Sequence, residues 1–155
     1  MRLERVAFDH PDAVALRAEM VAEISTLYVA RVPQQNRDGG TGVDPADVVM
    51  TAVGYDNDHE PVAHVAVRHI DAGLEIKRMF ITPSRRGRGW SSVLLAAAED
   101  AVREAGGVRV ILHTGDRQSA AIALYLAHGF GPVDVYPPYR DVPNSLCFAK
   151  DLSAV

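Results

Sequence analysis

The chain has 155 residues, of which 48% are apolar and 23% charged, values typical of one soluble globular domain with a sizeable core. Its net charge of −4 argues against a nucleic-acid-binding surface. The first residues carry charges where a secretory signal needs apolar side chains, and no segment approaches the length of a membrane span. Cys147 is the only cysteine, which excludes an internal disulfide and a cysteine-based zinc cluster. We expect a single cytoplasmic domain over residues 1–155, with no metal and no nucleic-acid or membrane partner.

The first half of the chain is expected to contain strands and one helix. Residues 3–8 alternate as a strand does, and residues 13–28 carry apolar side chains at helical spacing, namely Leu16, Met20, Ile24 and Leu27. Two prolines and several glycines make residues 32–45 the most flexible stretch of the sequence. Short polar turns then separate three apolar runs, which predicts an antiparallel meander with strands over residues 48–55, 62–70 and 74–81.

The second half alternates helices and strands. A helical pattern that begins at about residue 93 repeats small and apolar side chains every three or four positions until Gly106-Gly107 ends it. The elements expected after it are a strand over 108–113, a helix over 119–128, and strands over 132–136 and 145–152. Because a strand–helix–strand crossover is parallel and right-handed, the pattern predicts an α/β (α+β) fold, with a mixed, mostly antiparallel central sheet and helices on both faces.

A basic, glycine-rich loop joins the third strand of the meander to the next helix. The loop carries Arg85, Arg86 and Arg88, whose guanidinium groups suit phosphate oxygens. A glycine-rich turn at a helix N-terminus presents unpaired backbone N–H groups in one direction, and the helix dipole adds partial positive charge there. The loop therefore indicates a site for a phosphorylated cofactor. The alternative is a basic surface turn that caps a helix.

The loop matches neither of two common phosphate-binding signatures. The sequence has no Gly-x-x-x-x-Gly-Lys-Ser/Thr string, and Ser92 stands where a dinucleotide fingerprint needs a third glycine after Gly87 and Gly89. The string Arg86-x-x-Gly89-x-Ser91 resembles the cofactor loop of the GNAT superfamily of acyl-CoA-dependent N-acyltransferases, which is usually Gln/Arg-x-x-Gly-x-Gly/Ala. Only the last position departs from that pattern, and serine is small enough to begin a helix there.

A second resemblance lies in the alanine-rich helix. Gln118, Ala121, Ile122 and Tyr125 fall on one helical stripe, where the small alanine leaves room for a molecule to lie alongside. A tyrosine in such a stripe is often a core residue, which is the alternative interpretation. The segment resembles the second GNAT signature, Asn-x-x-Ala-x-x-Leu-Tyr-x-x-x-Gly-Phe, with Gln118 in place of the asparagine. Both motifs occur in the family's order, and the resemblance, which covers residues 48–152, implies a single GNAT-like domain.

The resemblance implies that acetyl-CoA is the co-substrate. In the family, the strand before the loop is splayed from its neighbour by a bulge, and its backbone N–H groups pair with the pantetheine amides and stabilise the oxyanion. The loop cradles the diphosphate. The residues that the resemblance implies in cofactor binding are Met79, Phe80, Ile81, Arg86, Gly87, Arg88, Gly89, Trp90, Ser91, Gln118, Ala121 and Tyr125.

The resemblance also implies catalytic roles. Tyr125 matches the family's general acid, which returns a proton to the coenzyme A thiolate. Glu75 lies where several family members place a glutamate that relays the amine's proton through water; the alternative is a solvated carboxylate paired with Lys77 on the same strand face. His113 is a second candidate base, because histidine titrates near neutral pH. His64, inside an apolar strand, is expected to be a satisfied core histidine.

Acceptor pockets in the family are usually built from the first helices, their connecting loop and the segment between the last two strands. Here these are residues 27–45 and 136–140, and the implied substrate contacts are Tyr136, Tyr139, Arg140 and His113. Carboxylates near the cleft favour a polyamine or an aminoglycoside, whereas Lys77, Arg78 and Arg140 favour the carboxylate of an amino acid.

We expect the protein to transfer an acetyl group from acetyl-CoA to a primary amine of a small molecule, as a monomer or a homodimer. Direct attack of the amine requires a base and a donor for the leaving thiolate, which are the roles given above to Glu75 and Tyr125. The alternatives are a protein or peptide N-acetyltransferase and a non-catalytic coenzyme A-binding regulatory module.

Overall fold

The computed structural model describes residues 1–27 and 42–153. Most of the stretch expected to be the most flexible, residues 32–45, lies outside the described residues, and so does much of the acceptor segment expected over 27–45. Within the described ranges, no helix combines the length and the apolar character that crossing a bilayer requires.

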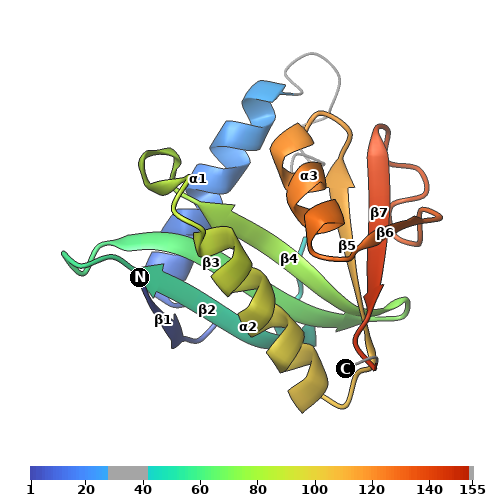
Figure 1. The fold of residues 1–155 in the computed structure, drawn as a ribbon, viewed down its shortest axis with the longest axis horizontal. Helices are drawn as coiled ribbons and strands as arrows, with labels where there is room; N and C mark the ends of the chain where they lie inside the picture. Colours follow the sequence, from blue (N-terminus) through green and yellow to red (C-terminus); the bar gives the residue numbers. More distant parts are fainter. Residues whose placement is uncertain (28–41, 154–155) are drawn as a thin grey trace.

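A seven-stranded sheet forms the centre of the described part of the molecule, in the order β1-β2-β3-β4-β5-β7-β6 (Figure 1). Neighbouring strands are antiparallel except for β4 and β5, which are parallel. The predicted mixed, mostly antiparallel sheet is thus confirmed, and so is the meander, which is β2-β3-β4. The strands are β1 (Arg2–Arg5), β2 (Val48–Tyr55), β3 (Pro61–Ile70), β4 (Gly73–Ile81), β5 (Arg109–Gly115), β6 (Gly131–Val133) and β7 (Ser145–Asp151).

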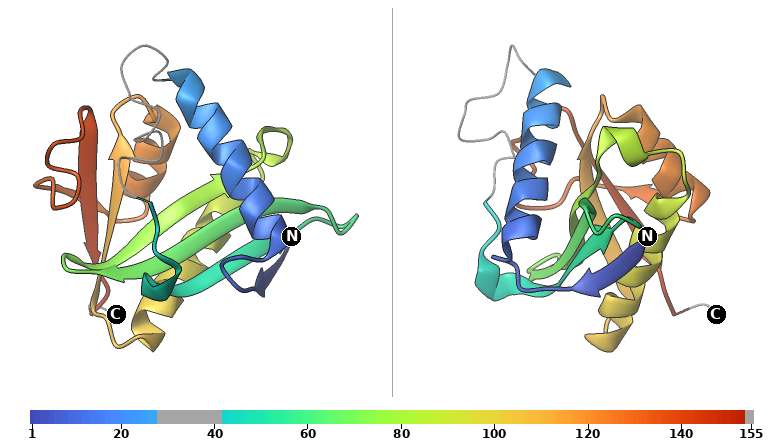
Figure 2. Two further views of the ribbon diagram at one scale, coloured as in Figure 1. Left: turned by 180° about the vertical axis from the view of Figure 1, so that it is seen from behind. Right: turned by 90° about the vertical axis from the view of Figure 1, so that its left-hand side faces the viewer.

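Helices cover both faces of the sheet, as predicted. The opposite views in Figures 1 and 2 show α1 (Pro11–Leu27) on one face, and α2 (Trp90–Glu104) and α3 (Ser119–Ala127) on the other. α1 starts at a proline, whose fixed φ suits the first helical position. α2 connects the parallel strands β4 and β5. Two short 3₁₀ helices, Pro45–Asp47 and Pro83–Arg85, complete the described helical segments.

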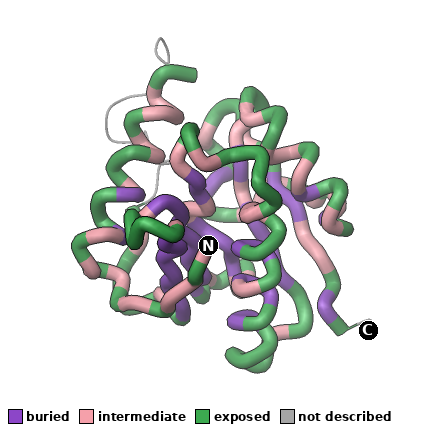
Figure 3. The backbone as a smooth tube through the Cα atoms, turned by 60° about the vertical axis from the view of Figure 1, so that its left-hand side comes forward, coloured by how far each residue is buried: buried purple, intermediate pink, exposed green. Residues whose placement is uncertain are grey.

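Two apolar cores hold these layers together. The larger core packs α2 and α3 against the sheet and includes Leu94, Leu95 and Val102 together with strand residues. The smaller core lies under α1 and contains Ala13, Leu16, Val53, Tyr55 and Phe80. The central strands are therefore buried on both sides, as the purple segments in Figure 3 show, which explains why β2 and β3 read as near-continuous apolar runs.

Strands β4 and β5 separate partway along their length. Their parallel pairing covers only Leu74↔Val110, Glu75↔Ile111 and Ile76↔Leu112, after which β5 pairs with β7 alone. Beyond that point β4 also carries a bulge against β3, where the left-handed φ of +57° at Arg78 marks the extra residue. The end of β4 consequently has a backbone edge that faces away from β3 and has no partner in β5.

Three predicted boundaries differ from the structure by three residues, and the others by no more than two. The first strand ends at Arg5 rather than at residue 8, because the chain turns there toward Pro11 at the start of α1. The helix expected from residue 93 begins already at Trp90, directly after the basic loop. The strand expected over 132–136 stops at Val133, because Tyr136 leaves the sheet edge and donates a hydrogen bond to Glu75.

Candidate active site

A cleft with a volume of about 430 Å³ passes through the sheet where β4 and β5 separate. The cleft is lined by α1 from one face of the sheet and by α3 from the other, together with the end of β4 and the basic loop. Its lining residues are Met20, Glu23, Ile24 and Leu27 of α1, Met79, Phe80 and Ile81 of β4, Arg86 and Ser91, Arg117, and Gln118, Ser119, Ala120, Ala121 and Leu124 at α3. Many of the residues implied in cofactor binding are therefore together in one place.

The basic loop ends in a turn that leaves space for a bound group. Gly89 adopts φ +76° immediately before α2, and its side-chain-free face opens on empty space, since a Cβ atom there would meet nothing within 4 Å. The backbone N–H groups of the first helical turn have no acceptor within the helix, and Gly89 provides no side-chain cap. An anion of phosphate size can therefore approach the backbone directly, as a diphosphate-binding loop requires.

The loop's arginines do not act as one cluster. Arg85 turns away and donates from Nε and Nη2 to Oδ2 of Asp56 at 3.0 and 2.9 Å, so the expectation that all three guanidinium groups suit a phosphate is wrong for Arg85. Arg86 lies at the cleft, where it binds the Glu23 carboxylate. The Arg88 guanidinium lies over the Trp90 ring, 5.5 Å from its centroid.

The bulge in β4 is held by His64, which the sequence indicated as a satisfied core histidine. His64 is fully buried, and its Nδ1 donates to the carbonyl oxygen of Arg78 at 2.7 Å, while its Nε2 lies 3.0 Å from Nη1 of Arg17 on α1. Since arginine only donates, Nε2 is the acceptor and the ring is neutral. Burial is the main reason why the pKa of His64 is lowered to about 4. The ring thus fixes the backbone that turns Met79 toward the cleft.

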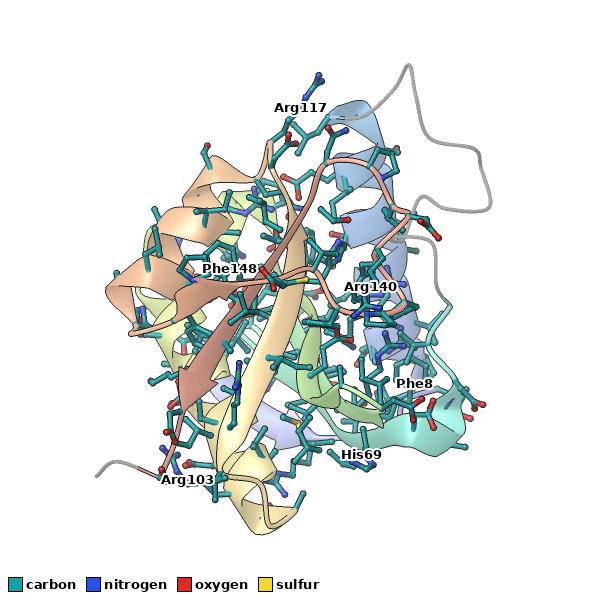
Figure 4. All side chains as sticks on the ribbon, turned by 90° about the vertical axis from the view of Figure 1, so that its right-hand side faces the viewer. Phe8, His69, Arg103, Arg117, Arg140 and Phe148 are labelled. Carbon is teal, nitrogen blue, oxygen red and sulfur yellow. The ribbon has the colours of Figure 1, made fainter. Side chains whose placement is uncertain are left out.

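Tyr125 lies one turn beyond Ala121 on α3. Its ring packs against Phe130 and Phe148, with centroids 5.8 and 6.3 Å away, and the residue is 7% exposed; Figure 4 shows Phe148 on β7, directed toward α3. Burial raises the pKa of the phenol to about 12. Tyr125 does not line the described cleft itself, but its helical neighbours Ala121 and Leu124 do.

Glu75 is fully buried just before β4 and β5 separate. Its Oε1 accepts from Nε of Arg68 at 2.8 Å and from the Tyr139 hydroxyl at 3.1 Å, and its Oε2 accepts from the Tyr136 hydroxyl at 2.6 Å. The alternative interpretation of a solvated carboxylate is therefore wrong. Burial opposes the charge of Arg68, but the Glu75 carboxylate and the Tyr139 hydroxyl together more than offset this, and the pKa of Arg68 is raised.

Two of the implied substrate contacts, Tyr136 and Tyr139, bind Glu75 directly, and none of the four lines the described cleft. Tyr139 is completely buried and stacks on His113 with ring centroids 3.8 Å apart, whereas Tyr136 is half-buried and Arg140 exposed. Figure 4 shows Arg140 on the β6–β7 connection, on the α1 side of the sheet. Burial, followed by Glu75, raises the pKa of Tyr136 well above its usual range. Tyr136 is therefore the member of this group that combines partial exposure with direct contact to the carboxylate.

His113 is poorly suited to act as a base. Burial, with smaller contributions from Lys77 and Arg68, lowers the pKa of His113 to about 3. Its Nε2 lies 2.9 Å from Oγ of Ser145, whose own proton goes to the carbonyl oxygen of Val142, so Nε2 is the donor. The ring is neutral at physiological pH and holds its neighbours in place.

Several residues of the site escaped the sequence interpretation. Of the four apolar positions at helical spacing in the first helix, Leu16 is in the smaller core and Met20 packs against that core, while Met20, Ile24 and Leu27 line the cleft, a role that the sequence did not indicate. Arg68 was not assigned a role, although the tight turn at residues 71–73 makes it the cross-strand partner of Glu75. The position of the turn sets the register of the two antiparallel strands, so the sequence could have indicated that Arg68 lies opposite Glu75. Figure 4 shows another unassigned residue, Arg117, before α3 and near the end of α1, where its Nη1 donates to the carbonyl oxygen of Leu27.

Comparison with known proteins agrees with this geometry. A family model described as Acetyltransferase (GNAT) family matches residues 23–130. An IAA acetyltransferase from Azospirillum brasilense is 41% identical over 78 residues, which are 50% of this chain and 51% of that protein. A streptothricin acetyltransferase from Streptomyces lavendulae is 32% identical over 93 residues, which are 60% of this chain and 49% of that protein. The matches thus span about half the length of these curated relatives.

The fold is shared along nearly the whole chain with solved structures. A protein from Klebsiella pneumoniae subsp. pneumoniae, described as a proposed acyl-CoA N-acyltransferase, superposes with a TM-score of 0.80 and 29% identity over 97% of both chains. The family model covers more than half of the sequence, and residues of both sequence motifs line the cleft. The chain belongs to the GNAT acetyltransferase family.

Proposed function

We propose that the protein transfers an acetyl group from acetyl-CoA to a primary amine of a small molecule. The observation that supports this most is the cleft between β4 and β5, which is lined by the unpaired end of β4 and by Arg86 and Ser91 of the loop that contains the open turn at Gly89. The unpaired strand edge suits the amides of a pantetheine arm, and the turn at Gly89 suits a diphosphate. Membership of the GNAT family agrees with both.

The cofactor-binding residues act mainly through their backbone. The N–H and C=O groups of Met79, Phe80 and Ile81 extend β4 toward the cofactor in the manner of strand pairing, and N–H groups at this edge serve the developing oxyanion. The turn from Arg86 to Ser91, which includes Gly87, Arg88, Gly89 and Trp90, holds the diphosphate. Gln118, directly before α3, and Ala121 of α3 border the same cleft and contact the pantetheine arm.

Bound acetyl-CoA supplies the acetyl group as a thioester, and the protein supplies the proton transfers. An amine that arrives as an ammonium ion first releases one proton to solvent, because only the neutral form has a lone pair for the attack. The nitrogen then attacks the acetyl carbon, the carbon–sulfur bond breaks, and the nitrogen loses one further proton. We assign that proton to a relay in which the Tyr136 hydroxyl accepts it while passing its own to Oε2 of Glu75, 2.6 Å away. A phenol takes the place of the water expected from the family resemblance. The raised pKa of Tyr136 disfavours a free phenolate, so both transfers occur together.

Tyr125 acts on the leaving sulfur in this proposal. The phenol, with its pKa raised to about 12, stays protonated throughout the physiological range. A coenzyme A thiol with a pKa of about 8.5 is a stronger acid than this phenol, so hydrogen-bond donation to the thiolate is favoured over complete proton loss. The hydroxyl is a suitable donor, because no described residue forms a hydrogen bond with it.

The substrate class rests on the cleft and on the relatives. One relative is named for streptothricin and another for IAA, both small molecules. A screen of acetyl-CoA consumption, read as thiol release across amino acids, polyamines, aminoglycosides and peptides, tests the assignment. We expect turnover with at least one small primary amine. Turnover confined to peptides would contradict the small-molecule assignment, and coenzyme A binding without turnover across the panel would favour a regulatory module.

Replacing Gly89 by valine is expected to raise the Kd for coenzyme A by about tenfold or more, because a β-branched side chain would occupy the space in front of the turn. Titration calorimetry measures the change. Gly106→Val is a matched control, since Gly106 has a similar φ of +82° and equally open surroundings but lies at the far end of α2. Both variants carry backbone strain of about 1–2 kcal/mol, and only Gly89→Val should lose affinity. Equal affinities in the two would remove the loop from the binding site.

Replacing Tyr136 by phenylalanine is expected to lower kcat by about a hundredfold, which is the usual contribution of a positioned proton-transfer group. Tyr139→Phe is the matched control: it removes the other phenol that donates to Glu75, but one that is fully buried. That control should unfold at a lower temperature while kcat stays within about fivefold of wild type. If both variants lose the same activity, the relay through Tyr136 is wrong.

A further inference from the structure

We propose that in the free protein the Glu23 carboxylate binds the Arg86 guanidinium group, which binds the cofactor's diphosphate in the complex. Cofactor binding then releases the carboxylate, which attracts a cationic amine into the cleft. The inference rests on the proposed function and adds a recognition residue and a substrate class to it. The acceptor is then an amine that carries positive charge at neutral pH, next to an apolar body.

The ion pair between Glu23 and Arg86 closes one side of the cleft. Arg86 donates from Nη1 to Oε1 of Glu23 at 2.7 Å and from Nη2 to Oε2 at 2.6 Å, a two-point contact between the basic loop and α1. Its Nε donates to the carbonyl oxygen of Ile81 at 2.9 Å. One guanidinium group therefore joins the loop, α1 and the end of β4, the three elements between which the cofactor has to enter.

This contact has the geometry that a guanidinium group offers to a phosphate. Two parallel N–H donors meet two oxygens of one planar anion, and a diphosphate presents the same arrangement with more charge. The side chains of Arg86 and Glu23 remain 45% and 38% exposed, so another anion can reach Arg86, and breaking the ion pair costs little free energy. The pKa of Glu23 is lowered, chiefly by its hydrogen bonds with Arg86, so the carboxylate is charged when the cofactor arrives.

Charge at the cleft argues for a role of Glu23 after the exchange. Among the described residues that line the cleft, Glu23 is the only carboxylate, whereas Arg86 and Arg117 are cationic. While Glu23 is bound to Arg86, its charge is neutralised. Once the diphosphate binds Arg86, the carboxylate is left without its partner and attracts a positive charge over several ångströms.

The neighbours of Glu23 indicate what the cation is attached to. Met20 and Leu27 lie three residues before and four residues after Glu23 on α1, Ile24 follows it directly, and all of them line the cleft. An acceptor that fits this face has an ammonium group beside an apolar portion. Because the carboxylate is free only after cofactor binding, acetyl-CoA is expected to bind first and the amine second.

The test compares Glu23→Gln with Glu19→Gln. Both variants remove one negative charge from α1, but Glu19 is exposed one turn away and does not line the described cleft. Glu23→Gln is expected to bind coenzyme A about three- to tenfold more tightly by calorimetry, because Arg86 no longer has a competing anion. With the best acceptor from the screen, its KM for the amine is expected to rise about tenfold with little change in kcat. Glu19→Gln should match wild type in both measurements.

A second variant distinguishes competition between Glu23 and the diphosphate for Arg86 from the general effect of removing a negative charge near the cofactor. Arg86→Gln is expected to weaken coenzyme A binding, and adding Glu23→Gln to it should give no further change, since the competition has already been removed. Coenzyme A affinity that is unchanged or weaker in Glu23→Gln would overturn the inference while leaving the proposed function intact. An unchanged KM for the amine would overturn the second half of it. Absence of coenzyme A binding to wild type would instead remove the proposed function itself.

Discussion

Replacing Tyr125 by phenylalanine is expected to lower kcat by about ten- to a thousandfold while the Kd for coenzyme A stays nearly constant. The hydroxyl matters only as the carbon–sulfur bond breaks, whereas the ring, which packs between Phe130 and Phe148, is retained. Single-turnover kinetics with saturating acetyl-CoA measures the chemical step, and calorimetry measures the cofactor affinity.

Stability provides the control for this experiment. No described residue forms a hydrogen bond with the Tyr125 hydroxyl, so its removal should leave the unfolding midpoint close to that of wild type. A loss of kcat together with an unchanged midpoint therefore reports on catalysis. Wild-type kcat in Tyr125→Phe would exclude the residue from the reaction and leave it as part of the larger core.

Replacing Glu75 by glutamine is expected to destabilise the fold by about 3–5 kcal/mol, because it leaves the Arg68 guanidinium buried without its counter-charge. Both side chains are almost completely buried, so solvent cannot substitute for the lost carboxylate. For a chain of this size the expected fall in Tm is roughly 6–20 °C. Thermal unfolding followed by circular dichroism measures it.

A double variant tests the origin of that loss. Arg68→Met combined with Glu75→Gln should be less destabilised than the sum of the two single variants, because neither charge is then left alone. Glu104→Gln, which breaks the exposed ion pair with Arg5, serves as the control and should leave Tm nearly unchanged. Additive losses in the double variant would mean that Arg68 and Glu75 stabilise the fold independently. Activity of Glu75→Gln has to be measured well below its lowered Tm, so that a loss of kcat reflects the relay.

The parts of the fold that the sequence predicts well are set by local patterns. The meander β2-β3-β4 follows from three apolar runs between polar turns, and the parallel crossover follows from one strand, one helix and another strand in order. The turn at Gly89 is also local, because a helix that starts after glycine leaves its N–H groups open whatever lies around it. Spacing alone therefore predicts the open turn at the end of the basic loop.

The parts that the sequence predicts poorly depend on contacts between distant segments. Glu75 is buried because Tyr136 and Tyr139, more than sixty positions later, fold inward over it, and nothing in the local pattern of β4 indicates a buried carboxylate. Arg85 and Arg86 are adjacent in the chain, yet one binds Asp56 and the other Glu23. Composition shows that a loop is basic, but the partner of each guanidinium group depends on tertiary structure.

The surroundings of the apolar residues of α1 also depend on tertiary structure. Helical periodicity correctly predicts that Leu16, Met20, Ile24 and Leu27 share a face, but it does not distinguish a face packed on a core from one that borders a cleft. Leu16 belongs to the smaller core under α1, and Met20 packs against that core and also lines the cleft. The rest of the face then lines the opening.

Amide hydrogen exchange with and without coenzyme A measures most directly whether the backbone of the cleft holds the cofactor. We expect coenzyme A to slow exchange in peptides that cover residues 79–81 and 87–92, where the free edge of β4 and the first turn of α2 lie, and to leave β1 and β7 unchanged. Slower exchange confined to other segments, with no change in these two, would contradict the binding mode proposed for the cleft.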